Sequence, residues 1–459
     1  MKNLVLPAIV VFLFLQACEQ GKKTDEKIVT ASVNLSNSEN STQESASTNV
    51  ATSQLASQKK DTTTELFLSK EEDMLSDPFI INYLNEKVKD YDVTDKRREE
   101  YLKQRKPQDI NYLENGNKKL NQGDYMASIE MFDKEIQKNP GNENAYYGRG
   151  LARFELGDYQ AASEDFGKVT ELNPARYDAY VKKGNSEFKM ADFDDASKAY
   201  EASISIKPTA EAYMNRAEIK FKKSDYTGAI KDYNAIIDKK LLSSFEVYFK
   251  RGVVKNEYGK YKEAIEDFNK AIELFSNYPV SYYQKALAEY RLHEYEKSVK
   301  NFSKALEYNS KDKESLMGRG IAYKHLKNYK KAIADFTTVV DLYSRSEDGY
   351  LHRAEIYGAM GNYLEAITDL DRALEINHTS KEAYYNRGRF YLEEGSLAKA
   401  YEDFGKVIEF SPKDAEAFYY KGICESEMKD TEKACVSFEK SLQLGYADAE
   451  DMMKDNCDK

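Results

Sequence analysis

The feature that most constrains this chain is a repeat of about 34 residues, which recurs ten times between Asp109 and Asp448. Repetition at this period indicates a stack of similar units, because one unit of that length cannot bury its own apolar face. One aligned column contains only glycine or alanine: Gly116, Gly150, Gly184, Ala217, Gly252, Ala286, Gly320, Ala354, Gly388 and Gly422. A second column, twelve residues later, contains only serine or alanine: Ser128, Ala162, Ala196, Ala229, Ala264, Ser298, Ala332, Ala366, Ala400 and Ala434.

These columns predict two antiparallel helices in each repeat. Small side chains on both helices let the two axes approach closely, and aromatic residues such as Tyr159 and Phe166 fill the space beside the contact. Pairs such as Gly157-Asp158 supply the turn between the helices. The glycines around Gly150 therefore indicate helix packing, since a phosphate-binding loop would need a further glycine where Arg153 stands. The predicted fold class is all-α.

The columns resemble the tetratricopeptide repeat over about three quarters of the chain. This resemblance implies a right-handed superhelix, or α-solenoid, of about ten helix pairs over residues 109–448. It also implies that the first helix of each pair lines a concave groove that binds partners. We expect a helical cap over residues 65–108 and a closing helix over residues 449–459, because the ends of such a stack need covering. Gly252→Leu should disrupt the packing, whereas Gly148→Ala, outside the small column, should be mild.

The fifth position of each repeat is apolar or aromatic and gives the candidate partner-binding residues. They are Tyr147, Met214, Phe249, Tyr283, Met317, Tyr385 and Tyr419, with Leu113, Val181 and Leu351 in the remaining copies. An exposed apolar row of this kind usually marks a partner site. The alternative is that these side chains pack against the first helix of the next repeat.

A column of cations stands immediately before the small residue of the first helix. Its members are Arg149, Lys183, Arg216, Arg251, Lys285, Arg319, Arg353, Arg387 and Lys421. They could bind an anionic partner, or they could pair with aspartates sixteen residues later. The second interpretation is favoured, because antiparallel packing places such residues side by side. The aspartates are Asp165, Asp232, Asp267, Asp335, Asp369 and Asp403.

The first residues differ from the rest of the chain. Lys2 precedes an apolar run from Leu4 to Leu15, which is too short to span a bilayer and typical of a signal peptide. The following Leu15-Gln16-Ala17-Cys18 resembles the lipobox of bacterial lipoproteins, which implies a signal peptide over residues 1–17 and lipidation of Cys18. The alternative is an ordinary secretory signal with a chance cysteine. Residues 18–64 are rich in Ser, Thr, Asn and Gln and are predicted to be a disordered tether.

Near the C-terminus, Cys435 and Cys457 lie 22 residues apart with Gly445 close to midway between them. Two helices that fold back at Gly445 bring these cysteines together, and disulfides persist in an oxidising envelope compartment. We therefore predict a Cys435–Cys457 disulfide and a buried free thiol at Cys424. Free thiols at all three positions are the alternative.

Composition narrows the classes of function that the sequence allows. A net charge of −11 disfavours nucleic-acid binding. Four histidines without ligand spacing and the lack of catalytic motifs predict no metal, no cofactor and no enzyme activity. The resulting hypothesis is an outer-membrane lipoprotein, periplasmic or surface-facing, that binds a protein or peptide in envelope assembly or secretion. The alternative is a glycan- or peptidoglycan-binding module with an aromatic groove.

Overall fold

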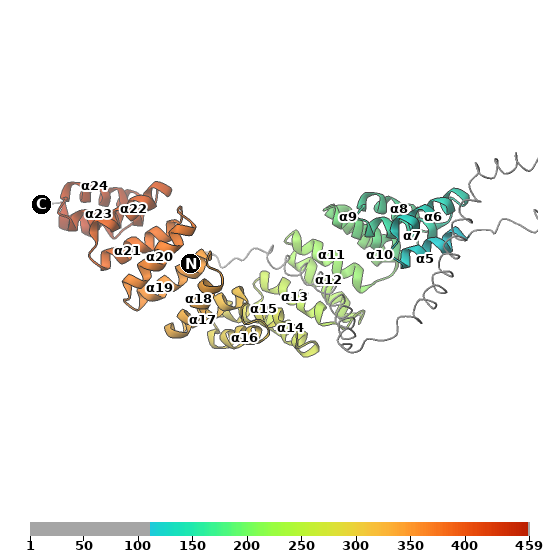
Figure 1. Cartoon of the computed structure of the whole chain (residues 1–459), viewed down its shortest axis with the longest axis horizontal. Helices are drawn as coiled ribbons and strands as arrows, with labels where there is room; N and C mark the ends of the chain where they lie inside the picture. The colour runs from blue at the N-terminus through green and yellow to red at the C-terminus, as the bar shows by residue number, and fades with distance from the viewer. Residues whose placement is uncertain (1–110, 458–459) are drawn as a thin grey trace, which may run out of the picture. The chain divides into compact units, whose positions relative to one another are not determined.

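The computed structural model describes residues 111–457, which form helices and no strand (Figure 1). The ten helix pairs are α5 (Tyr112–Asn121) with α6 (Tyr125–Lys138), α7 (Glu143–Glu155) with α8 (Tyr159–Leu172), α9 (Tyr177–Lys189) with α10 (Phe193–Ile206), α11 (Ala210–Lys222) with α12 (Tyr226–Asp238), α13 (Phe245–Glu257) with α14 (Tyr261–Leu274), α15 (Pro279–Arg291) with α16 (Tyr295–Tyr308), α17 (Lys313–His325) with α18 (Tyr329–Leu342), α19 (Glu347–Ala359) with α20 (Tyr363–Ile376), α21 (Lys381–Glu393) with α22 (Leu397–Phe410), and α23 (Ala415–Glu427) with α24 (Thr431–Gln443). A last helix, α25, covers Ala449–Asn456. The predicted all-α solenoid is confirmed.

Several predictions concern residues outside this range. The signal peptide, Cys18, the tether and the N-terminal cap at 65–108 all lie outside the described residues. Among residues 111–457, no helix combines the length and the apolar character needed to cross a membrane.

The turns inside the repeats follow from local sequence. Gly157 has a φ of 84°, a left-handed conformation that glycine adopts without a steric penalty. The next residue, Asp158, caps α8 by accepting a hydrogen bond from the backbone N–H of Ala161 at 3.2 Å. In other repeats the left-handed position is held by residues such as Ala191 and Lys327. The turn geometry is therefore kept even where the sequence lacks glycine.

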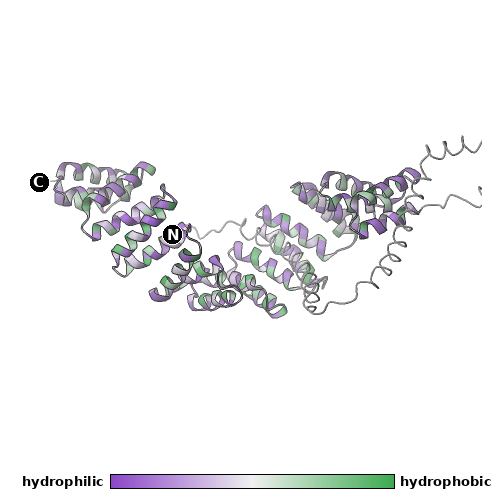
Figure 2. Ribbon diagram, viewed as in Figure 1, coloured by the Kyte–Doolittle hydropathy of each residue, from purple (hydrophilic) through white to green (hydrophobic). Residues whose placement is uncertain are grey.

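The core of each repeat lies between its two helices. Gly252 of α13 faces the ring of Phe268 on α14, and a Cβ added there would lie 2.7 Å from the ring atom Cε1. Phe268 is fully buried, as are its equivalents Phe166 and Phe336. Hydropathy alternates around the helices, so that each has an apolar and a polar side (Figure 2). The small column of the first helix therefore exists because a large ring of the second helix occupies the space in front of it.

Gly148 lies in an equally close contact, on the other side of α7. A Cβ added at Gly148 would lie 2.3 Å from Cζ of Phe132, a fully buried residue of the preceding repeat. The expectation that alanine would be mild there is therefore wrong. The sequence argument considered packing within one repeat and missed that α7 also packs against α6.

Helices contact their neighbours in chain order. Each helix packs against the next, and the first helices of adjacent repeats also contact each other, whereas the second helices have no comparable contacts. We call the surface formed by the first helices the inner face. Between α11 and α13 the contact of the first helices is much reduced, and a longer connection over residues 239–244 joins their repeats.

Ion pairs decide between the two interpretations of the cation column for its arginines. Six arginines each donate two hydrogen bonds to the aspartate sixteen residues later, as in Arg251–Asp267 at 2.9 and 2.5 Å. Most of them also donate to a side chain on the preceding second helix, as Arg319 does to Ser303 at 3.1 Å. We call the position of the arginine side chain, between successive second helices, the slot. The pairs are Arg149–Asp165, Arg216–Asp232, Arg251–Asp267, Arg319–Asp335, Arg353–Asp369 and Arg387–Asp403. Structural pairing, the favoured interpretation, describes these six arginines.

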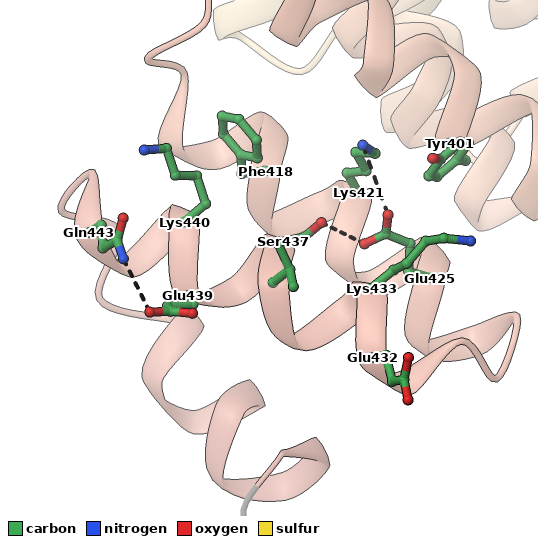
Figure 3. Close-up of a pocket in the computed structure, with 11 residues that line it drawn as sticks. Tyr401, Phe418, Lys421, Glu425, Glu432, Lys433, Ser437, Glu439, Lys440 and Gln443 are labelled. Carbon is green, nitrogen blue, oxygen red and sulfur yellow. Dashed lines mark hydrogen bonds and ion pairs between the residues drawn. The ribbon is translucent and has the colours of Figure 1, made fainter.

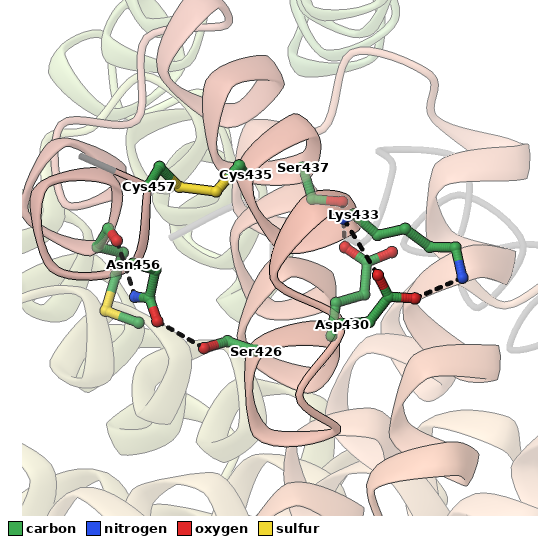
Figure 4. The surroundings of a disulfide bond; sticks show 9 residues. Ser426, Asp430, Lys433, Cys435, Ser437, Asn456 and Cys457 are labelled. Carbon is green, nitrogen blue, oxygen red and sulfur yellow. Dashed lines mark hydrogen bonds and ion pairs between the residues drawn. A yellow bond between two sulfur atoms is a disulfide. The ribbon is translucent and has the colours of Figure 1, made fainter. Parts of the chain in front are cut away.

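The C-terminal end is covered by α25, which a disulfide joins to α24 (Figure 4). The bond links Cys435 to Cys457, the pair predicted from their spacing, with 5.7 Å between the Cα atoms. Cys424 is a fully buried free thiol, and burial raises its pKa to about 12. Ala449 and Met453 of α25 pack on the apolar cluster of the last repeat.

Reduction of this disulfide should loosen the last repeat before any other. Closing a loop of 22 residues restricts the unfolded chain and stabilises the folded end by about 3 kcal/mol. Hydrogen exchange should therefore quicken in α23 to α25 after reduction or in Cys457→Ser, and stay unchanged in α13 and α14. Unchanged exchange in α23 to α25, or peptide mapping that pairs Cys435 with Cys424, would contradict the prediction.

Candidate functional site: the inner face

The predicted partner-binding residues all lie on first helices, but they are not equally accessible. Tyr147, Met214, Tyr283, Met317, Tyr385 and Tyr419 are half-buried, so each keeps part of its side chain at the surface. Phe249 is 2% exposed, because Tyr278 and Phe268 pack against its ring. Its assignment to a partner-binding surface is therefore corrected: Phe249 is a core residue.

Tyr147 packs against neighbouring residues while part of its side chain stays at the surface. Its ring meets Phe166 of the same repeat edge-on, with 5.6 Å between centroids. The guanidinium of Arg176, just before the next first helix, lies 4.2 Å from the centroid of the Tyr147 ring. Burial, followed by the charge of Asp178 and a hydrogen bond to it, raises the Tyr147 pKa far above its ordinary value. The hydroxyl therefore stays protonated and can donate a hydrogen bond.

Tyr385 repeats this arrangement near the C-terminal end. It packs edge-on against Phe404 and Tyr420, with centroids 6.0 and 5.9 Å away. Burial, and then a hydrogen bond to Glu416 at the start of the next first helix, raise its pKa. The half-buried rings thus join neighbouring repeats while part of each side chain stays accessible. Packing against the next repeat is confirmed for these tyrosines, and their role in partner binding stays a prediction.

Polar side chains separate these rings. The amide oxygen of Asn185 on α9 accepts hydrogen bonds from the Tyr200 hydroxyl at 2.7 Å and from the Asn215 amide at 2.8 Å. The Asn185 amide nitrogen donates to Glu211 at 3.3 Å. This amide pair links the third and fourth repeats. The aligned sequence did not predict this pair, because its members occupy different positions in their repeats.

Histidines that are scattered in sequence meet beside the turn that joins α15 to α16. His325 stacks on Tyr295 with 4.5 Å between centroids, and its Nε2 lies 2.9 Å from the Tyr290 hydroxyl. His293 Nδ1 lies 2.8 Å from the Tyr295 hydroxyl. Burial, Lys324 and His293 lower the pKa of His325. Aligning adjacent repeats could have found this cluster, because Tyr290 and His325 fall at neighbouring repeat positions.

An ion-pair group borders the histidines. Lys324 donates to Glu355 at 2.6 Å, and His352 Nδ1 lies 3.6 Å from the same carboxylate. The nearby His352 and the hydrogen bond from Lys324, opposed by burial, lower the pKa of Glu355 to about 2. Within residues 111–457, no three His, Cys, Asp or Glu side chains gather closely enough to hold a metal ion. The chemistry available on this face is therefore hydrogen bonding, ring contact and ion pairing.

Comparisons with known proteins agree with this geometry. Models of the tetratricopeptide repeat match residues 113–177, 181–241, 245–278, 283–347, 351–415 and 416–448. Among solved structures, YrrB, described as a TPR protein with an unusual peptide-binding site, is 26% identical over 41% of this chain and 97% of its own, with a TM-score of 0.37. A tetratricopeptide repeat protein from Parabacteroides merdae is 20% identical over 61% and 97%, with a TM-score of 0.37. Yeast Tom70 is 14% identical over 75% and 94%, with a TM-score of 0.34.

No curated protein sequence matches the chain. The repeat models cover nearly all of residues 113–448, and the helix pairs, small columns and buried rings of the structure account for that match. Proteins built from this repeat bind other proteins or peptides, and the repeat is typically a non-catalytic scaffold. The chain belongs to the tetratricopeptide repeat family.

Proposed function

We propose that this protein is a non-enzymatic scaffold, anchored in the outer membrane by lipid on Cys18, that binds a segment of another protein along its inner face. Its role would lie in assembly or secretion at the cell envelope. The observation that carries the binding proposal is the row of half-buried Tyr and Met side chains on successive first helices. Such side chains offer apolar and, for Met, adaptable contact area, which suits the capture of a peptide or helix.

A protein partner fits this face better than a glycan does. Sugar rings stack on an exposed aromatic face, but Arg176 covers one face of Tyr147 and neighbouring rings crowd Tyr385. What remains accessible is ring edges and thioethers, interspersed with amides such as Asn185. Edges and amides suit the side chains and backbone of an extended or helical segment.

Photo-crosslinking from defined positions tests the binding proposal. A photoreactive amino acid at the exposed inner-face positions Asn144 or Arg389 should capture the same partner in cells. Matched controls at Lys262 and Glu365, exposed on second helices, should not capture it. A partner captured equally from the control positions, or captured only there, would contradict binding along the inner face.

The anchoring proposal rests on the N-terminal apolar run and on the Leu15-Gln16-Ala17-Cys18 motif in which it ends. Several acyl chains on Cys18 would hold the protein stably at a membrane. Cys18→Ser should therefore move the protein from the membrane fraction to the soluble fraction. A wild-type protein that never incorporates labelled fatty acid would rule out the lipid anchor while leaving inner-face binding open.

A further inference from the structure

The slot is filled differently in the last repeat. Its first helix, α23, carries Lys421 in place of arginine, and α24 carries Ser437 in place of aspartate. On the preceding second helix, α22, the corresponding residue is Gly405, which has open space in front of it. In other repeats this place holds side chains such as Asp133, Ser303 or Thr337, which bond to the arginine. Three groups that fill the slot elsewhere are thus missing here.

Beside this position lies a cavity of about 660 Å³, lined by α23 and α24 together with Tyr401 of α22 (Figure 3). Its lining contains three lysines, three glutamates and two aromatic rings. The lining residues are Tyr401, Phe418, Lys421, Glu425, Glu432, Lys433, Val436, Ser437, Glu439, Lys440 and Gln443. Lys433 is already paired with Asp430 at 2.6 Å, so acidic groups outnumber unpaired cations at this cavity.

Glu425 is the buried acceptor in this cavity. Its side chain is 2% exposed and accepts one hydrogen bond, from the Ser437 hydroxyl at 2.5 Å. The Lys421 nitrogen lies 3.9 Å from the other carboxylate oxygen, beyond hydrogen-bonding distance. A buried carboxylate normally has several charge-assisted hydrogen bonds, because burial without them is costly. Glu425 therefore has unused capacity for a cationic donor.

Other repeats show how the slot meets that need. Asp267 binds both Arg251 and Lys255, at 2.5 and 2.9 Å. Asp232 likewise binds both Arg216 and Lys220, at 2.7 and 2.8 Å. Two cations on one buried carboxylate therefore occur within this chain. In the last repeat the carboxylate stands instead on the first helix, since Glu425 of α23 occupies the position of Lys255 on α13, and it has only Lys421 nearby.

The third repeat shares two of these three substitutions. The sequence EDFGKV occurs at residues 164–169 and again at 402–407, and each copy precedes a first helix with lysine in the slot, but the third repeat has Ala199 where the last has Ser437. There Lys183 lies 3.7 Å from Glu187, whose buried Oε2 has no hydrogen-bond partner. Burial raises the Glu187 pKa. In both repeats a buried glutamate thus lies beside the slot lysine without a close ion pair.

We propose that the groove between α22 and α24 binds an arginine side chain of a partner protein, with the guanidinium hydrogen-bonded to Glu425. Arginine is favoured over lysine because its planar fork binds a carboxylate through two parallel hydrogen bonds and stacks on rings such as Tyr401 and Phe418. Lys421 already lies 4.9 Å from the centroid of the Tyr401 ring, so a cation at this ring is accommodated. This site is lined mainly by the second helix α24 and does not rest on the inner-face proposal.

The test uses the full chain and a short peptide. Acetyl-Gly-Arg-Gly-amide is titrated while NMR follows ¹³C-labelled methyl groups of Val436, which lines the cavity and is 67% exposed. The matched control peptide carries citrulline, which has nearly the same shape without the charge. The arginine peptide should give a saturable shift at least tenfold tighter than citrulline. Equal shifts from both peptides would overturn the proposal.

Two variants locate the site. Lys421→Arg places an internal guanidinium beside Glu425 and should weaken peptide binding at least tenfold without lowering the unfolding temperature. Glu425→Gln removes the charge of the carboxylate while keeping its shape, and should also weaken binding at least tenfold. Wild-type affinity in either folded variant would show that the peptide binds elsewhere and would refute the assignment.

Discussion

Gly252→Leu should force apart α13 and α14, the two helices of the fifth repeat. A Cβ at Gly252 already lies 2.7 Å from Phe268, and leucine adds three more carbons where a fully buried ring stands. Neither helix can move away freely, because α13 also packs against α12 and α14 against α15. Overpacking of this kind costs about 1–3 kcal/mol, and more where the backbone must shift. The expected result is a lower free energy of unfolding, with faster hydrogen exchange centred on α13 and α14.

Two glycines provide the controls for Gly252. Gly405→Ala should stabilise the protein by about 0.5–1 kcal/mol, because the site is helical and no atom outside the local backbone lies near the added Cβ. Gly148→Ala should destabilise it, because the Cβ would meet Phe132. If Gly405→Ala proves as damaging as Gly252→Leu, close contact with the ring is not the cause.

Asp267→Ala is expected to have the second large effect. Asp267 is 3% exposed and binds Arg251 and Lys255, and Lys255 is itself 7% exposed. Removing the carboxylate leaves two cations without their anion in a largely buried site, which costs about 3–5 kcal/mol. The free energy of unfolding should fall accordingly, and Lys255→Met in the same chain should recover part of the loss.

An exposed ion pair gives the matched control for Asp267. Lys270 and Glu273 lie one turn apart on α14 at 2.9 Å, both largely in solvent. Glu273→Ala should change the free energy of unfolding by less than about 0.5 kcal/mol, because exposed pairs gain little. A loss at Glu273 equal to that at Asp267 would show that burial of the pair is not what matters.

The sequence predicted the helix pairs because each is determined by residues within one 34-residue unit. Gly252 and Phe268 recur at fixed spacing, so the register could be deduced from one chain. Contacts between repeats were harder to predict. Gly148 faces Phe132 of the preceding repeat, and Phe249 is covered by Tyr278 from the following connection. Phe132 lies in a different aligned unit from Gly148, and Tyr278 lies at the very end of the unit that contains Phe249.

The candidate site was also only partly predicted from the sequence. The half-buried tyrosines were found because they share one repeat position, whereas the His325 cluster and the Asn185–Asn215 pair join different positions of successive repeats. The cavity at Glu425 is lined by Lys421 and Ser437, which replace the arginine and aspartate of other repeats. Each is unremarkable alone, and only the folded chain brings them together at the cavity.

The reduced contact between α11 and α13 has a mechanical consequence. Because helices contact mainly their neighbours, a tensile load applied along the stack passes through every interface in series. Springs in series extend most at the softest element, and the junction over residues 239–244 combines a longer connection with a weaker first-helix contact than the other junctions have. Elastic strain would therefore concentrate at this junction, and under rising force the helix pairs on either side of it would part before their own interiors yield.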